Sequence, residues 1–226
     1  MRNKNGARMR QFDFYEFTGI LVPGATVLAG VLLLVPDFIK PESIKDFSVG
    51  GLGLFIVLAY VLGHLVQAVG NGVESVWWKL WGGMPTDWLR TKPDCVLAPS
   101  QLTALEKAIK GRLGLDGLQI AHSTAGQWYA VTRQVYAEVA GAGRAARIDV
   151  FNGNYGLNRG IGAGLLVVLV IALINWPVNW TFAGGVTAAL ALAIYRMHRF
   201  ARHYAREVFV QFLQLPAREF NKENNQ

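Results

Sequence analysis

The stretch that decides the fold is GLLVVLVIALI, Gly164–Ile174, which lies in a longer region without any charged residue from Gly160 to Tyr195. A helix of about 20 predominantly apolar residues crosses the hydrocarbon core of a membrane, because each residue adds about 1.5 Å to a path of about 30 Å. The region is interrupted only by the turn sequence NWPVNWT. We therefore expect two spans here, Tyr155–Trp176 and Trp180–Tyr195.

Two further apolar stretches, Phe17–Ile39 and Gly50–Gly70, precede the deciding one. Inside lipid only a helix or a closed barrel satisfies the backbone polar groups. The sequence therefore predicts an all-α integral membrane protein with four transmembrane helices in two hairpins, and a helical domain inserted between spans two and three. The alternative is a buried helical hairpin of a soluble protein. The expected segments are an interfacial N-terminal part (1–16), a first hairpin (17–70), a cytosolic domain (71–154), a second hairpin (155–195) and an amphipathic tail (196–226).

Charge is distributed unevenly over the segments between the spans. The net charge is +2 before the first span, −1 between spans one and two, +3 from Asn71 to Arg159, zero in the turn between spans three and four and +3 from Arg196 onward. Because Lys and Arg accumulate on the cytoplasmic side, both termini and the inserted domain are expected in the cytosol, with the chain in the bacterial inner membrane. The first apolar stretch is too long for a signal peptide, so we expect an uncleaved anchor.

The inserted segment has the pattern of two short amphipathic helices. The first is expected to be capped by Ser100 and to end at Gly111 or Gly114, and the second is expected to run from Ser123 to Gly141. The apolar face of the second helix comprises Trp128, Val131, Val135 and Val139. Such a core is small, so we expect the membrane helices or other copies of the chain to complete it.

The second span carries the most specific pattern in the chain. Its helical pattern continues past Gly70 to Trp81, before two glycines stop it. Five polar residues recur at intervals of 4, 3, 4 and 3 and so share one helical face; they are Tyr60, His64, Gln67, Asn71 and Glu74. Polar groups at membrane depth rarely face lipid. The row therefore lines either a water-filled path between copies or a hydrogen-bonded seam between packed helices.

Candidate ligand contacts lie in the inserted segment. Arg133, Arg144 and Arg147 flank a glycine-rich turn, where guanidinium groups and backbone amides can hold phosphate. Trp128 lies nearby and could stack on a base. The alternative is an ordinary helix core with the arginines that are typical of cytosolic segments. We expect contacts with membrane lipid under both interpretations.

The sequence contains none of the patterns that would indicate catalysis. It has no His-Glu-x-x-His motif and no Cys-x-x-Cys pair, and its single cysteine, Cys95, has no histidine near it in sequence. We therefore expect no enzyme, no cofactor and no metal.

Two short strings, FYEFTGILVPG at the first span and YGLNRG at the entry to the third, resemble those of small prokaryotic four-helix membrane proteins that accompany immune or stress systems. The layout is similar to that of the membrane effector of the Hailong antiphage system. That resemblance implies a homo-oligomeric ion channel, whose cytosolic part responds to a short DNA oligomer made by a partner nucleotidyltransferase. Our first expectation for the copy number is a tetramer.

We therefore expect a homo-oligomeric membrane channel or pore-forming effector that is controlled through its cytosolic domain, in an antiphage or stress response. In this hypothesis the polar row of span two lines the path. The alternative is a non-conducting membrane scaffold that recruits a soluble partner through the middle domain and the basic tail.

Overall fold

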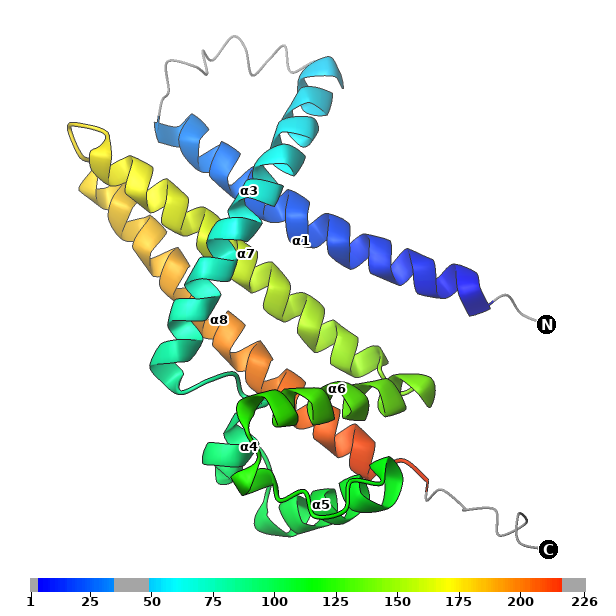
Figure 1. Cartoon of the computed structure of the whole chain (residues 1–226). Coiled ribbons are helices and arrows are strands. Elements are labelled where there is room, and N and C mark those ends of the chain that lie inside the picture. Colours follow the sequence, from blue (N-terminus) through cyan, green and yellow to red (C-terminus); the bar gives the residue numbers. More distant parts are fainter. Residues whose placement is uncertain (1–3, 35–48, 217–226) are drawn as a thin grey trace, which may run out of the picture. The chain divides into compact units, whose positions relative to one another are not determined.

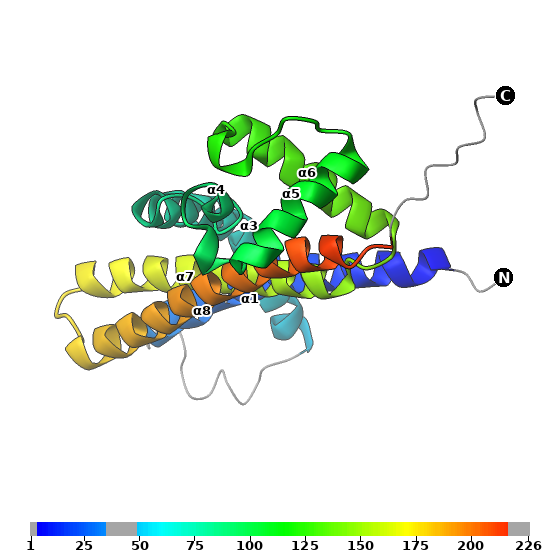
Figure 2. The ribbon, with the colours of Figure 1, turned by 90° about the horizontal axis from the view of Figure 1, so that it is seen from below.

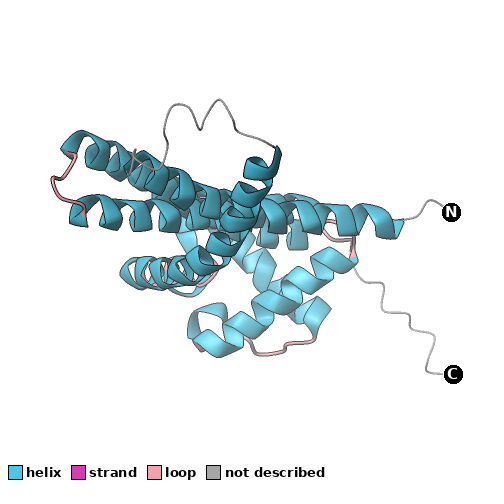
Figure 3. Cartoon of the chain, turned by 90° about the horizontal axis from the view of Figure 1, so that it is seen from above, coloured by secondary structure: helices cyan, strands magenta, loops and turns pink. Residues whose placement is uncertain are grey.

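The computed structural model describes residues 4–34 and 49–216, with side chains from Thr18 to Leu34 and from Gly50 to Pro216. The described part of the chain is helical throughout, as expected from the sequence, and Figure 3 shows helices and loops only. Its seven α-helices are α1 (Lys4–Leu34), α3 (Val49–Trp81), α4 (Trp88–Thr91), α5 (Pro99–Leu113), α6 (Ala125–Gly141), α7 (Ala146–Ile174) and α8 (Trp180–Leu213). Two short 3₁₀ turns, Pro93–Cys95 and Ile120–His122, lie among them.

Two helices are long and apolar enough to cross a membrane, and they are Gly50–Trp81 within α3 and Ala146–Ile174, which is α7. The apolar part of α1, Thr18–Leu34, is shorter. The expectation of four spans is thus supported for two of them. In α8, small residues and an early Arg196 dilute the apolar stretch. Residues 35–39 of the first expected span and the tail beyond Pro216 lie outside the described residues.

Most residues in the apolar parts of these two helices are not buried. Of the 18 most apolar consecutive residues, 17% are buried in α3 and 39% are buried in α7. Large side chains such as Leu54, Val61 and Leu65 are more than half exposed on α3. Exposed apolar residues gathered on one helix in this way are typical of surfaces that a membrane or a partner covers.

The chain divides into two compact units. Unit 1 comprises residues up to Lys79 together with Gly153–Phe200, and unit 2 comprises Leu80–Asn152 together with the residues from Ala201 onward. The long helices α7 and α8 are each continuous and contribute to both units.

In unit 1, α3 crosses α1 at a contact made by small residues (Figure 1). A Cβ atom on Gly24 would collide with the carbonyl oxygen of Ala59, and one on Gly63 would collide with that of Ile20. Ala59 itself has no exposed surface. Glycine and alanine thus let the two backbones touch, which is how membrane helices gain packing energy without a hydrophobic driving force.

The glycines that open the apolar part of α7 also face neighbouring helices. A Cβ on Gly160 would lie 2.5 Å from Cγ of Pro23 on α1, and one on Gly162 would lie 3.2 Å from Cδ1 of Ile194 on α8. Within unit 1, α7 and α8 run side by side as a hairpin (Figure 2). Gly184 and Gly185 of α8 have no described atom within 4 Å of an added Cβ.

Unit 2 has a core built around α6. Its four predicted apolar residues are buried, and the Trp128 ring stacks on Phe209 of α8 with ring centroids 5.7 Å apart. The core that looked too small in sequence is therefore completed by the C-terminal part of α8, which also buries Val208 and Phe212. The predicted ends at Gly114 and Gly141 are confirmed.

Two predicted helix starts are wrong by one or two residues. α5 begins at Pro99, whose fixed φ suits the first helical turn, and the Gln101 side chain accepts a hydrogen bond from the backbone N–H of Ala98. α6 is capped by Thr124, whose hydroxyl accepts from the backbone N–H of Gln127. The predicted cap Ser123 instead donates its hydroxyl to the carbonyl of Ile120 in the preceding turn.

Candidate polar site between α3 and α7

The polar row of α3 divides into two strips. Gln67 and Glu74 are half-buried, whereas Tyr60, His64 and Asn71 are exposed. A helix advances 100° per residue, so the two strips lie beside each other on adjoining parts of one face. The row is therefore partly a seam inside the protein and partly an outward-facing surface.

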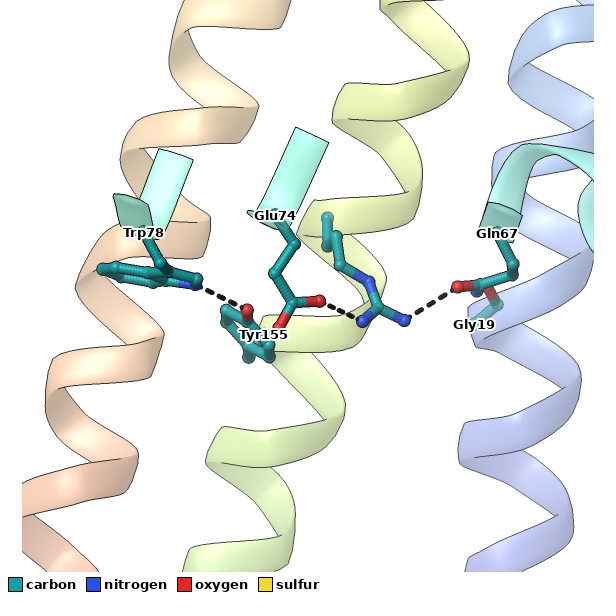
Figure 4. Close-up of polar contacts among 6 residues, drawn as sticks. Gly19, Gln67, Glu74, Trp78 and Tyr155 are labelled. Atoms are coloured by element: carbon teal, nitrogen blue, oxygen red, sulfur yellow. Dashed lines mark hydrogen bonds and ion pairs between the residues drawn. The ribbon is translucent and has the colours of Figure 1, made fainter. Parts of the chain in front are cut away.

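Arg159 of α7 joins the inner strip to the bundle. Its guanidinium forms an ion pair with the Glu74 carboxylate and donates a hydrogen bond to Oε1 of Gln67 at 2.9 Å. Gln67 in turn donates from Nε2 to the backbone carbonyl of Gly19 on α1 at 2.7 Å. The network thus connects three helices of unit 1, and Figure 4 shows Gln67 and Gly19 at one end of it.

Aromatic side chains continue this polar layer toward the end of α3. The indole N–H of Trp78 donates to the hydroxyl of Tyr155 at 2.9 Å, and both side chains are buried (Figure 4). His198 of α8 stacks on Trp78 with ring centroids 5.3 Å apart and accepts at Nδ1 from Nε1 of Trp77 at 3.3 Å. Because Tyr155 and Arg159 are one turn apart on α7, they meet Trp78 and Glu74, which are one turn apart on α3.

The Arg159–Glu74 ion pair at the centre of the network is not fully buried. The Arg159 and Glu74 side chains keep 21% and 22% of their surface exposed, so the pair lies at the edge of the bundle. The Nε atom of Arg159 is buried without a hydrogen-bond partner. In the described part of the chain no group of three His, Cys, Asp or Glu residues could hold a metal ion.

The outer strip combines polar and small side chains. His64 meets the edge of the Tyr60 ring, with centroids 4.8 Å apart. Beside His64 and Asn71, the exposed residues Ala68, Gly72 and Ser75 leave the helix backbone accessible, and an added Cβ on Gly72 would meet no described atom within 4 Å. We call these six residues the outer strip: Tyr60, His64, Ala68, Asn71, Gly72 and Ser75.

The three candidate arginines of unit 2 are exposed, whereas the candidate Trp128 is buried. Arg144 donates to the backbone carbonyl of Gln214 at 2.9 Å and Arg147 forms an ion pair with Glu207 at 3.4 Å. Trp128 has no exposed surface and donates from Nε1 to the carbonyl of Thr86 at 2.7 Å. Since the core encloses both faces of this indole, it offers no surface on which a base could stack.

One titratable group lies near Arg133. Burial raises the pKa of the Tyr204 hydroxyl on α8; the positive charge of Arg133 opposes this shift, and Asp149 and Tyr129 add to it. Tyr129 is 65% exposed one turn before Arg133 on α6. On α6, Arg133 is an exposed cationic side chain and Tyr129 is an exposed aromatic one, so both are accessible to a ligand.

Sequence reasoning missed Arg159 and Arg112. Arg159 was counted with the positive charges that precede an apolar span, although its place one turn after Tyr155 could have indicated a partner for Glu74. Arg112 of α5 donates to the backbone carbonyls of Leu215 and Pro216 after α8, and no sequence signal marks this contact. Comparison of the chain with protein-family models, with curated proteins and with solved structures found no match.

Proposed function

We propose that this chain is a multi-pass membrane protein with four spans that assembles with copies of itself and conducts ions along the outer strip of α3. The observation that carries the proposal is the outer strip itself, since an apolar helix suited to a membrane exposes an imidazole, a phenol and an amide on one side. Lipid tails can cover the leucines of α3, but they cannot satisfy these polar groups.

Copies that meet along the outer strip would solve this problem. Ala68, Gly72 and Ser75 allow close approach of backbones, and polar side chains hydrogen-bond across such contacts. A symmetric assembly of three or more copies would turn His64 and Asn71 toward a common axis, where water satisfies them. Our expectation for the copy number remains a tetramer.

Unit 2 is the proposed site of control. The helices α7 and α8 run without interruption from unit 2 into unit 1, so a ligand that changes unit 2 acts on helices that also carry the polar site. Arg133 and Tyr129 are the contacts we propose for an anionic ligand, such as a nucleotide or a short nucleic acid. An antiphage role and a nucleotidyltransferase partner remain part of this hypothesis.

A non-conducting scaffold is the second candidate. The inner strip favours it, because Gln67 and Glu74 find their partners within one chain and need no water-filled path. The two candidates differ in the outer strip, which serves conduction in one and only assembly in the other.

Ion flux from liposomes that carry the purified protein tests the proposal. The wild type is expected to release a trapped ion, and the double variant His64→Leu/Asn71→Leu is expected to lose at least 90% of that flux. Val69→Leu, an exposed apolar exchange on the same helix, is the control and should conduct normally. Absence of flux from the wild type at a mass that shows several copies would support the scaffold instead.

A further inference from the structure

The outer strip lies beside the few charged residues that unit 1 carries along its apolar helices. Between Gly50 and Lys79 and between Gly153 and Tyr195, the sequence holds three charged residues, Glu74, Lys79 and Arg159, and Thr18–Leu34 holds none. Glu74 and Arg159 pair with each other. An ion that moves along α3 therefore meets two sets of fixed charge beside the apolar part of the helix, this pair and the exposed Lys79.

We propose that the Arg159–Glu74 pair sets the charge selectivity of the path, an inference that rests on the function proposed above. About a fifth of each side chain remains exposed, so the pair is within reach of the medium that fills the path. Asn71 of the outer strip lies three residues before Glu74 and four residues after Gln67, which places it next to both network members on the helix surface. The paired charges cancel, so the pair gives the wild-type path no charge preference, and the loss of either charge creates one.

The network predicts the direction of each change. Removing the carboxylate leaves an uncompensated guanidinium, which attracts anions and repels cations. Removing the guanidinium has the opposite effect. In surroundings of intermediate dielectric constant, a unit charge several Å from an ion is strong enough to change its occupancy by roughly tenfold.

One substitution changes the charge without breaking the pair. Gln67 already accepts a hydrogen bond from Arg159, so Gln67→Glu would place a second carboxylate on the same guanidinium. Arg159 keeps its partners in this variant, whereas the new carboxylate oxygen replaces the amide that donated to the Gly19 carbonyl and must turn away from it. The variant should fold, and it gives the network a net charge of −1.

The experiment is a measurement of reversal potential in planar bilayers with a KCl gradient, on the full-length protein. Glu74→Gln is expected to raise the permeability ratio of chloride to potassium about tenfold, and Arg159→Gln and Gln67→Glu are expected to lower it by a similar factor. Lys107→Gln and Asp94→Asn remove exposed charges in unit 2 and should leave the ratio unchanged.

The possible results separate the two proposals. If Glu74→Gln and Gln67→Glu conduct with the wild-type permeability ratio, the selectivity role of the pair is wrong while the channel stands. If the single neutralising variants fail to assemble, Gln67→Glu alone decides, and an unchanged ratio in it overturns the inference. If the wild type carries no current, the proposed channel is itself wrong.

Discussion

Arg159 binds Glu74 across an interval of 85 residues and so fastens α7 to α3 where the apolar part of each helix gives way to polar residues. The same guanidinium reaches Gln67, whose amide holds the backbone of α1 at Gly19. One side chain thus determines which part of the polar row faces inward. The outer strip is what remains for contacts with other copies.

The ion pair should contribute strongly to the stability of unit 1. Arg159→Met leaves the Glu74 carboxylate without its partner, and removing one member of a largely buried pair costs about 3–5 kcal/mol. Thermal unfolding in detergent should show a clear loss of stability. The double variant Arg159→Met/Glu74→Leu should recover most of it, because no charge is then left unpaired. Equal stability of the wild type and Arg159→Met would show that the pair holds nothing together.

The crossing of α1 and α3 should tolerate no larger side chain. In Gly63→Val the added Cβ would collide with the carbonyl of Ile20, so the helices must separate and the protein should unfold or aggregate on extraction. Gly53 lies on the same helix with no described atom within 4 Å of an added Cβ. Gly53→Val should therefore give a normal elution profile on gel filtration. A normal profile for Gly63→Val would refute the close contact.

Trp128 and Tyr129 are adjacent in sequence and should respond differently to truncation. Trp128→Ala removes a fully buried ring from the core of unit 2, which costs about 3–5 kcal/mol. Tyr129→Ala removes a ring that is 65% exposed and should change stability by about 0.5 kcal/mol or less. Limited proteolysis between residues 80 and 152 would measure the difference. Equal cleavage of the two variants would contradict the buried position of Trp128.

Arg133 and Arg144 of the predicted ligand group should respond differently to truncation. Arg144→Ala is expected to increase hydrogen exchange at the end of α8, because its guanidinium holds the carbonyl of Gln214. Arg133→Ala should leave exchange unchanged and weaken the response to an added anionic ligand, for which inorganic polyphosphate and a short oligodeoxynucleotide serve as probes. An identical exchange pattern in both variants would contradict the role of Arg144 in holding the end of α8.

Much of the fold could be predicted from the sequence because it depends on local pattern. The end of α3 at Gly82, which has φ +77°, and the buried face of α6 follow from glycine conformation and helical periodicity. The starts of α5 and α6 were missed because Pro99 and Thr124 compete with nearby serines as start signals.

The tertiary partners could not be predicted in the same way. The spacing of the polar row places its five members on one helix face, but which of them turn inward depends on Arg159, which is distant in sequence. Likewise, the apolar row at the end of α8 indicated an amphipathic helix without indicating Trp128 as its partner. Periodicity predicts that a face is buried, whereas the partner depends on the arrangement of the whole chain.

The central claim is that the outer strip of α3 lines a path for ions, and cysteine accessibility at position 64 tests it most directly. In a Cys95→Ser background, which removes the only native cysteine, His64→Cys would be exposed during current recording to a charged methanethiosulfonate reagent. Modification at position 64 is expected to block the current. The same reagent should leave the current of Leu192→Cys, an exposed position of α8, unchanged. A current that persists after position 64 is fully labelled would contradict the account.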